Sequence, residues 1–473
     1  MAPLHPCLTF NYSSLFLKIS GIGRLLWNTG CLKISCHATE VIKKFLRIIP
    51  SDLPDELKLK GSHFTRNRKL PLQWLLTFIL SMVASGKAKG VAIKINEFFT
   101  QAKRSGLWPE AKSLHPSSFT KARKKLQWEV LRHLLHKAAT LAYECWPQNP
   151  RWKWKGLNVL AFDGSDIKLP ATPQIRGEFD PSSGLGNDGK GHYPQCLMMT
   201  LYDVFRRFPI ARSVARASAP ERDQALALLP HVPEGSILVL DRGFPGYRFL
   251  HYLMYEHPVH FVARCQAKSS FKPLMRFIKS GLAEDVIELG PPVQLRNQFC
   301  RTLRLRVIRL ESPNGQITAL LTSLIDTQKY PAAEILSLYR KRWEIEIFYR
   351  SEKSEMNLET FHGKTSNAIL QEIYASAIMA VIARVLMALS QEHEEPDFPE
   401  PQFKNALMVL ASDAAALSAS NPQRAIRVFN HILERISRIK YYRHKTQRPA
   451  YPRVNKSCRN KWKTGRQSRL AFS

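Results

Sequence analysis

Acidic residues are scarce in this 473-residue sequence, with 38 Asp and Glu against 70 Lys and Arg, which leaves a formal net charge of +32. Such an excess of positive charge repels itself and is best balanced by a polyanion, whose phosphates release counterions when Lys and Arg bind them. Ribosomal or chromatin-type packing proteins share this charge but rarely carry so much apolar sequence. The charge therefore predicts a nucleic acid as partner, ahead of an anionic membrane surface.

Paired cysteines are missing as well. The eight Cys are spread singly along the sequence and form no C-x2-C pair, and no Cys and His residues have the spacing of zinc ligands. Scattered single thiols are typical of a reducing cytosol. We therefore expect a cytoplasmic protein, associated with the nucleoid.

Long uncharged hydrophobic runs are also absent from the sequence. The stretch after Phe10 is interrupted by Lys18 and Arg24 and has no clear small-residue cleavage site, so it does not predict an export signal. The longest apolar run, residues 70–86, contains Gln73 and falls short of the ~20 residues of a membrane span. Basic residues flank it on both sides, which leaves a membrane helix open, but a buried core helix is the favoured interpretation.

The spacing of apolar residues changes along the chain. Apolar side chains recur at 3.6-residue intervals in residues 41–49, 74–84, 92–102 and 128–143, which predicts helices. From about residue 151, short apolar runs alternate with helical segments, as in an α/β layer. The sequence therefore predicts a helical domain followed by an α/β domain.

A basic helix start follows Ser117 and Ser118, which are good N-cap residues. Lys121 and Arg123 lie just inside it. This arrangement suits a helix laid against DNA, although a solvated basic face explains it nearly as well. Both residues are candidates for DNA binding.

Two aspartates close two buried strands. The first apolar run ends at Asp163 and the turn Gly164-Ser165, and the second, residues 237–241, ends at Asp241. Active sites of α/β sheets gather at the carboxyl ends of strands, and paired carboxylates suit Mg²⁺ or Mn²⁺. An ordinary Asp-Gly turn explains each motif equally well when it is taken alone.

A third acid lies on a helix that we expect to begin at residue 332 and to continue without a break. At ~100° per residue, offsets of 3, 7 and 14 from Tyr339 place Arg342, Glu346 and Lys353 within ~60° of it. One helix face therefore presents a phenol, a guanidinium, a carboxylate and an ammonium group.

The neighbours of this stripe decide between two interpretations. Trp343 and Arg350 flank it, whereas Glu344 points about 140° away. Charges on a helix usually form a solvated salt-bridge face. A Trp and a Tyr among them are better explained by contact with phosphates and bases, where cations bind and rings stack.

The same four residues form the spaced pattern Tyr339-x2-Arg342-x3-Glu346-x6-Lys353. It resembles the YREK signature of insertion-sequence transposases of the IS-four family, which are relatives of the Tn-five transposase. Other motifs agree with this resemblance: Phe162-Asp163-Gly164, Leu240-Asp241-Arg242-Gly243-Phe244, and Leu321-Thr322-Ser323 ahead of Tyr330-Pro331. The resemblance covers roughly residues 64–389 and is weakest before Asp163.

The resemblance implies an α/β fold class, with a ribonuclease H-like catalytic core that contains a strand-rich insertion and follows a helical N-terminal domain. Asp163, Asp241 and Glu346 would be the DDE catalytic residues and would bind two Mg²⁺ (or Mn²⁺) ions. Tyr339, Arg342 and Lys353 would hold the phosphate backbone of the DNA end, and we add Trp343 and Arg350 as DNA-binding candidates from their place beside the stripe.

With this resemblance, the chain divides into seven expected segments. They are an unassigned start (1–38), a helical DNA-binding domain (39–150), the first part of the core (151–264), the strand-rich insertion (265–328), the completion of the core (329–395), a helical C-terminal region (396–434) and a basic tail (435–473). From Arg435 to Arg469 the tail contains thirteen Lys and Arg and no acid.

The expected activity is metal-dependent cleavage at insertion-sequence ends, followed by transfer of the cut strand into target DNA. The implied partner is double-stranded DNA, both inverted-repeat ends and target, and a homodimer would hold the two ends together. A related nuclease that cuts without joining, or a catalytically dead DNA-binding repressor, are the alternatives.

A glycine-rich segment, residues 184–191, satisfies G-x-G-x-x-G and most of a P-loop. Gly191 replaces the Ser or Thr that would hold Mg²⁺, and no helix is predicted after it. We therefore expect a flexible loop near the active site, with His192 as a structural or phosphate-contacting residue.

Overall fold

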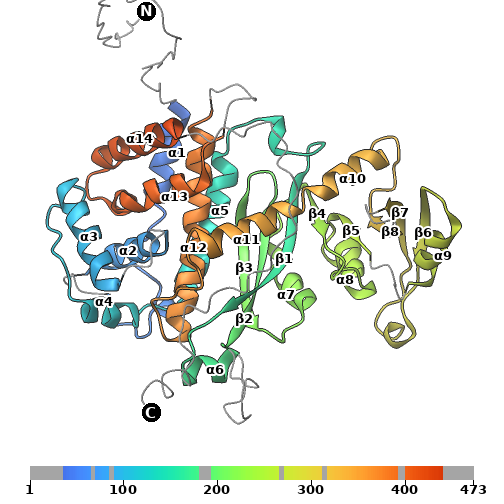
Figure 1. Ribbon diagram of the computed structural model, residues 1–473, viewed down its shortest axis with the longest axis horizontal. Coiled ribbons are helices and arrows are strands. Elements are labelled where there is room, and N and C mark those ends of the chain that lie inside the picture. Colours follow the sequence, from blue (N-terminus) through green and yellow to red (C-terminus); the bar gives the residue numbers. More distant parts are fainter. Residues whose placement is uncertain are drawn as a thin grey trace, which may run out of the picture. The chain divides into compact units, whose positions relative to one another are not determined.

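A mixed eight-stranded sheet, with helices packed against it, organises the protein (Figure 1). The computed structural model describes residues 36–64, 70–84, 90–179, 193–265, 271–311, 317–392 and 400–439. All of these belong to one unit, Ser35–Ser473. Residues 1–35, the glycine-rich segment with His192, and the tail from residue 440 onward lie outside the described residues.

The first elements are helical, as the 3.6-residue spacing predicts. Their aromatic side chains form one cluster, in which the ring of Trp74 stacks on Trp108 at 4.5 Å and Phe78 meets Phe119 edge-on at 4.9 Å. The helices are α1 (Cys36–Phe45), α2 (Leu72–Ala84), α3 (Val91–Arg104), α4 (Pro116–Arg123) and α5 (Glu129–Cys145), with short 3-10 turns at Asp55–Leu57 and Pro150–Trp152.

The first five strands lie in the order β3-β2-β1-β4-β5 and form the core part of the sheet. Strands β1, β2 and β3 are antiparallel neighbours, whereas β4 and β5 run parallel to β1. This is the strand order of a ribonuclease H-like fold, and the predicted fold class is confirmed. The strands are β1 (Asn158–Lys168), β2 (Gln195–Asp203), β3 (Phe208–Arg216), β4 (Ser236–Leu240) and β5 (His260–Arg264).

Several helices connect these strands. Helix α7, which joins β3 to β4, contacts β2 and β3. The connecting helices are α6 (Pro173–Phe179), α7 (Glu221–Leu228), a 3-10 turn (Leu229–His231), α8 (Tyr247–His251) and a π-helical turn (Tyr252–Glu256).

The region after β5, where we expected a strand-rich insertion at residues 265–328, is joined to the core sheet by strand pairing. Val262 of β5 pairs with Thr322 of β8, so these strands extend the core sheet in the order β5-β8-β7-β6. A helix that the sequence reading did not include also lies there. The elements are α9 (Lys272–Ser280), β6 (Glu284–Leu289), a 3-10 turn (Val293–Leu295), β7 (Leu303–Glu311) and β8 (Ile317–Thr322).

The expected continuous helix from residue 332 is three helices, α10 (Ala332–Arg340), α11 (Trp343–Ser354) and α12 (Ser366–Leu389). At the first break, the amide of Arg342 bonds the carbonyl of Tyr339, and the amide of Ile345 bonds that of Arg342. These bonds span three residues instead of four, so the chain tightens locally and the ideal 100° register does not run unbroken across the motif.

Helix α12 is the only helix among the described residues that is long and apolar enough to cross a membrane. Nearly all of it is buried against other parts of the protein, where it contacts α5, α2, β3 and α13. The described part of the chain ends with α13 (Phe403–Ser412), a 3-10 turn (Ala414–Ser418) and α14 (Pro422–Arg438). Arg435, which we expected to open the basic tail, lies inside α14 and pairs with Asp413 at 3.2 Å.

Candidate active site

The register of β1 and β4 places the two aspartates side by side. These parallel strands pair from Asn158 with Ser236 to Ala161 with Val239. Continuing each strand by two residues leads to Asp163 and Asp241, which therefore lie level with each other, just beyond the last ladder pair. A shared edge of two strands explains why two aspartates 78 residues apart meet.

Strand β1 does not end at Asp163, contrary to the sequence expectation. It continues to Lys168, because its other edge stays paired with β2, with Asp163 opposite Thr200 and Lys168 opposite Gln195. Only its pairing with β4 stops before the aspartate. Gly164 and Ser165 therefore belong to the strand and form no turn.

The third acid comes from α11. Glu346 lies in the first turn of this helix, and its carboxylate accepts a hydrogen bond of 2.7 Å from Nη2 of Arg342, the residue that caps the helix. Both side chains act electrostatically on Asp163. The fold therefore brings Asp163, Asp241, Glu346 and Arg342 to one place, as the motif pattern predicts.

Arg342 is unusual because it is buried and only partly satisfied. Its side chain is 6% exposed, and Nε and Nη1 have no hydrogen-bond partner among the described residues. Buried donors without partners are costly. Two guanidinium nitrogens are thus available to an anion that enters the site, such as a phosphate.

Tyr349 fixes the position of Asp163 and was not singled out from the sequence. Its hydroxyl donates to the backbone carbonyl of Asp163 at 2.6 Å and lies 3.4 Å from that of Met198. Three residues farther along α11, Glu352 forms a completely buried ion pair with Arg212 of β3. The helix that carries Glu346 is therefore tied to the sheet at two points.

Negative charge accumulates at Asp163. Burial, and then the carboxylates of Glu346, Glu221 and Asp241, raise its pKa to about 7, while Arg342 opposes the shift. A carboxyl group with so high a pKa lacks enough positive charge around it. A cation that bound here would relieve this repulsion.

The site fits a divalent metal by its donors, although it is not assembled as a metal centre. Carboxylate oxygens and excess negative charge are what Mg²⁺ and Mn²⁺ require. Across the described residues, however, no three His, Cys, Asp or Glu side chains are grouped so that they could hold an ion. Glu346 is paired with Arg342, so ligation by all three acids requires this carboxylate to turn away from the guanidinium.

The other residues of the helix motif are placed around this centre. Lys353 donates to the carbonyl of Asp166 on β1 at 2.8 Å, and Trp343 and Arg350 are exposed. The buried Tyr339 has its pKa raised to about 12, chiefly by burial.

Glu344 faces away from the acids, as expected, with its carboxylate 3.4 Å from Nε of Arg207.

Lys121 and Arg123, both proposed to contact DNA, have different surroundings. Lys121 is exposed on α4. Arg123 is 5% exposed, and its guanidinium pairs with Glu372 at 2.8 Å and bonds Gln371 at 2.7 Å, both on α12. Arg123 thus joins the helical region to the core, and our expectation of a DNA contact there is corrected, because its donors are used inside the protein.

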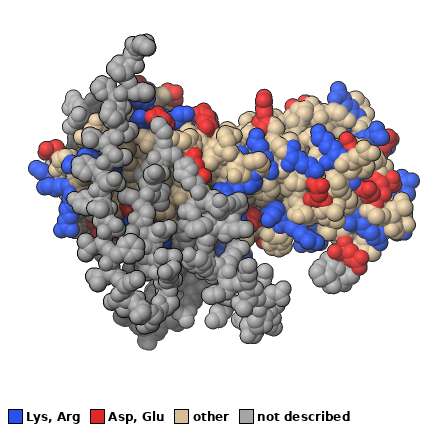
Figure 2. Space-filling model, turned by 90° about the horizontal axis from the view of Figure 1, so that it is seen from above, with Lys and Arg blue, Asp and Glu red and all other residues tan. Residues whose placement is uncertain are grey.

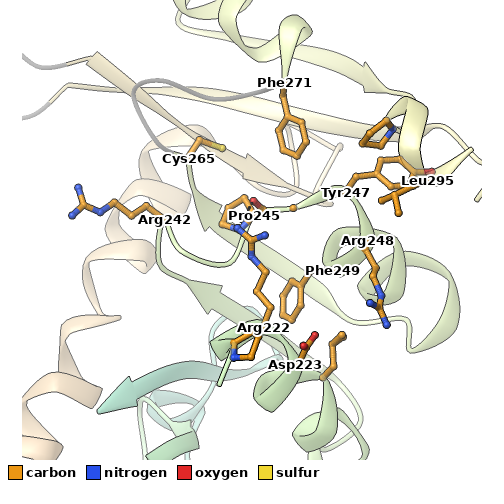
Figure 3. A pocket seen from close by; sticks show the side chains of 14 residues that line it. Arg222, Asp223, Arg242, Pro245, Tyr247, Arg248, Phe249, Cys265, Phe271 and Leu295 are labelled. Atoms are coloured by element: carbon orange, nitrogen blue, oxygen red, sulfur yellow. Dashed lines mark hydrogen bonds between the residues drawn. The ribbon is translucent and has the colours of Figure 1, made fainter. Parts of the chain in front are cut away.

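A cavity of about 490 Å³ adjoins the loop after Asp241 (Figure 3). Arg222, Arg242 and Arg248 line it together with aromatic rings and Asp223. Figure 2 shows Lys and Arg side chains scattered over the visible described surface, with Asp and Glu among them. Three arginines therefore lie around the loop that follows Asp241.

Comparison with known proteins agrees with this geometry. Residues 154–382, from just before β1 into α12, match the family model described as "Transposase DDE domain". The matched region contains the whole sheet and the helix with Glu346. Residues 154–382 therefore form a DDE transposase domain, the domain of a family of phosphoryl-transfer enzymes that act in DNA transposition and generally use divalent metal ions.

Individual relatives are similar at lower identity. The transposase InsG for insertion sequence element IS4 of Escherichia coli (strain K12) is 24% identical over 77% of this chain and 80% of its own length. A probable transposase for insertion sequence element IS5377 of Geobacillus stearothermophilus is 27% identical over 32% of this chain and 39% of its own length. A solved piggyBac transposase synaptic complex with hairpin DNA has a TM-score of 0.42, with 13% identity over 86% of this chain and 84% of that one.

Proposed function

We propose that this transposase cuts DNA at the ends of an insertion sequence and joins the freed 3′ ends to target DNA, with Asp163, Asp241 and Glu346 as its catalytic acids. The observation that carries the proposal is the register of β1 and β4. This register places Asp163 and Asp241 side by side, just beyond the last pair of the β1–β4 ladder. In this position, burial and the neighbouring carboxylates raise the pKa of Asp163. A structural Asp-Gly turn would need neither feature.

In this proposal the three acids hold two Mg²⁺ or Mn²⁺ ions. Such ions activate the attacking oxygen and stabilise the leaving oxygen during in-line displacement at phosphorus. Asp163 and Asp241 would ligate from adjacent strands. Glu346 would ligate from α11 after it leaves Arg342, whose guanidinium is then free to bind a phosphate.

Two displacement reactions account for cutting and joining. In the first, a water oxygen bonds to phosphorus, the bond to the 3′ oxygen breaks, and that oxygen leaves as a free 3′-hydroxyl. In the second, this hydroxyl attacks a target phosphodiester and displaces another 3′ oxygen. One bond forms as one breaks in each reaction, so no energy source or covalent protein intermediate is required.

DNA would be held by the motif residues around the acids. Arg342 has two unpaired buried nitrogens, and Tyr339 packs beside it, while Lys353 and Arg350 extend the positive stripe along α11. The exposed ring of Trp343 is available for stacking on a base. We further propose that a homodimer holds both ends, and that the protein works in the cytoplasm at the nucleoid.

The direct test is cleavage of a duplex that carries the terminal repeat, with Mg²⁺. We expect Asp163→Asn, Asp241→Asn and Glu346→Gln each to abolish cutting and to retain end binding, because the amides keep the shape but lose the charge. Glu344→Gln is the matched control, since it makes the same change on the same helix beside Arg207. Cutting at near wild-type rate by any of the first three would remove that residue from the site.

A further inference from the structure

A fourth acid, Glu221, reaches the opening between β1 and β4. If Gly164 carried a Cβ atom, it would lie 2.7 Å from Oε1 of Glu221, closer than real Cβ contacts allow. A Cβ atom on Gly243 would lie 3.7 Å from Oε2 of the same carboxylate. Gly164 follows Asp163, and Gly243 lies two residues after Asp241, so the Glu221 carboxylate spans the two aspartate segments.

The sheet leaves room for this approach. Pairing between β1 and β4 stops at Ala161 and Val239, so no ladder hydrogen bond closes the sheet at the level of Asp163. Successive side chains of a strand point to opposite faces of the sheet, so a Cβ atom on Gly164 would lie on the face opposite the Asp163 side chain. Glu221 therefore enters the opening from one face of the sheet, and Asp163 borders it from the other.

Helix α7 is anchored at this place by the neighbour of Glu221. Arg222 donates from Nε to the carbonyl of Gly243 at 2.9 Å and from Nη2 to that of Pro245 at 3.4 Å. Figure 3 shows its side chain extending from α7 toward Pro245. The start of α7 and the loop after Asp241 are thus one connected unit, and the position of Glu221 does not depend on its own flexible side chain alone.

Glu221 has no cation beside it. No ion pair or hydrogen bond joins its carboxylate to a described residue, and burial, Asp166 and Asp241 raise its pKa. An acidic side chain in the first turn of a helix ordinarily stabilises the helix by its favourable interaction with the helix dipole. Asp223, two residues later, lies in the same first turn and can interact with the helix dipole in the same way. The close approach of the Glu221 carboxylate to Gly164 and Gly243 therefore calls for a different explanation.

We propose that Glu221 is a fourth carboxylate of the active site and helps Asp163 and Asp241 to bind a divalent cation at the opening between β1 and β4. This inference rests on the proposed function, since it assigns a further ligand to the same site. It also accounts for the glycine at position 164. A side chain at Gly164 would displace the Glu221 carboxylate from the position that faces both aspartates.

The test measures metal affinity separately from DNA cutting. The full-length protein is titrated with Mn²⁺, and free Mn²⁺ is followed by electron paramagnetic resonance. We expect Glu221→Gln to raise the Kd of the site by roughly tenfold or more. Asp163→Asn is the positive comparator. Asp223→Asn, an identical loss of charge in the same helical turn, should bind Mn²⁺ like wild type.

A second set of variants tests the geometry. Gly164→Ala should weaken Mn²⁺ binding, because the new methyl group displaces the Glu221 carboxylate. The same change in a Glu221→Ala background should add little further loss, because the group that the methyl displaces is already gone. Full additivity of the two changes would overturn the proposed arrangement.

The outcomes separate this inference from the proposed function. If Asp163→Asn weakens Mn²⁺ binding and Glu221→Gln does not, Glu221 is no ligand and the three-acid site stands. If neither change affects Mn²⁺ binding, both the site and its fourth acid are refuted. If Asp223→Asn weakens binding as much as Glu221→Gln, the effect is one of general charge and the inference is again overturned.

Discussion

The buried pair between Arg212 and Glu352 is the clearest place to perturb the position of the catalytic helix. Arg212 is 1% exposed on β3, and its Nη2 donates to the Glu352 carboxylate on α11 at 2.5 Å. The hydroxyl of Ser376 on α12 donates to the same carboxylate at 3.1 Å. One acid therefore connects α11, which carries Glu346, to the sheet and to the central helix.

Replacing Arg212 by Met removes one partner and leaves a buried carboxylate without its cation. Breaking a buried ion pair in this way costs roughly 3–5 kcal/mol. Combining Arg212→Met with Glu352→Gln removes the uncompensated charge, and most of the loss should be recovered. An exposed pair on α14 serves as control: Arg438→Met, which frees Glu434, should cost less than about 1 kcal/mol.

Thermal unfolding followed by circular dichroism measures these differences. The midpoint shift per kcal/mol falls with chain length, to about 1–2 °C for a unit of this size, so Arg212→Met should lower the midpoint by roughly 3–10 °C. A shift of less than about 2 °C would show that the pair does not hold α11 in place. If the double variant did not regain the lost stability, the guanidinium of Arg212 would stabilise the protein by its packing and not by compensating the charge of Glu352.

Three other predictions concern the site itself. The pKa of Asp163 is about 7 in the folded chain and ordinarily 3.8, so the folded state binds more protons between these values. The metal-free protein should therefore lose stability as the pH rises from about 4 to 7. Asp163→Asn should lack this slope in urea titrations and be the more stable protein at pH 8. Arg342→Ala should reduce cleavage per bound complex more than it reduces end binding, since Arg342 lies against Glu346 and two of its nitrogens have no hydrogen-bond partner among the described residues. Equal loss of binding to end and scrambled duplexes in gel shifts would count against that role. Tyr349→Phe removes the hydrogen bond to the Asp163 carbonyl and should cost about 1 kcal/mol of stability. It should also slow cleavage with little change in DNA affinity, and an unaltered rate would show that the hydroxyl does not position Asp163.

Local patterns predicted the parts of the fold that depend on local physics. Continuous apolar runs mark β1 and β4, because both strands are buried on both faces. The 3.6-residue spacing marks α5, which buries one broad stripe, and α2, which is buried on almost every side. The spacing of Tyr339 and Glu346 likewise identified the helical motif that lies beside the aspartates.

Features that depend on long-range partners were missed or misread. Strand β1 continues past Asp163 because β2 pairs with it, which no pattern within β1 reveals. The sequence around Arg123 suggested a DNA contact because it contains no acidic partner for this arginine. Its partner, Glu372, lies 249 residues farther along the chain. Glu221 sits in an ordinary amphipathic helix, and only the closeness of Gly164 shows where its carboxylate lies.

Strand joining is the measurement that tests the central claim most directly. A pre-cut duplex with the terminal repeat and a free 3′-hydroxyl is incubated with the protein, Mg²⁺ and a supercoiled target plasmid, and the junctions are sequenced. We predict covalent joining of the 3′ end to target DNA, with paired insertions that leave a short duplication of constant length, and no joining by Glu346→Gln. Efficient cutting of uncut ends without any joined product would contradict the account and identify a nuclease instead.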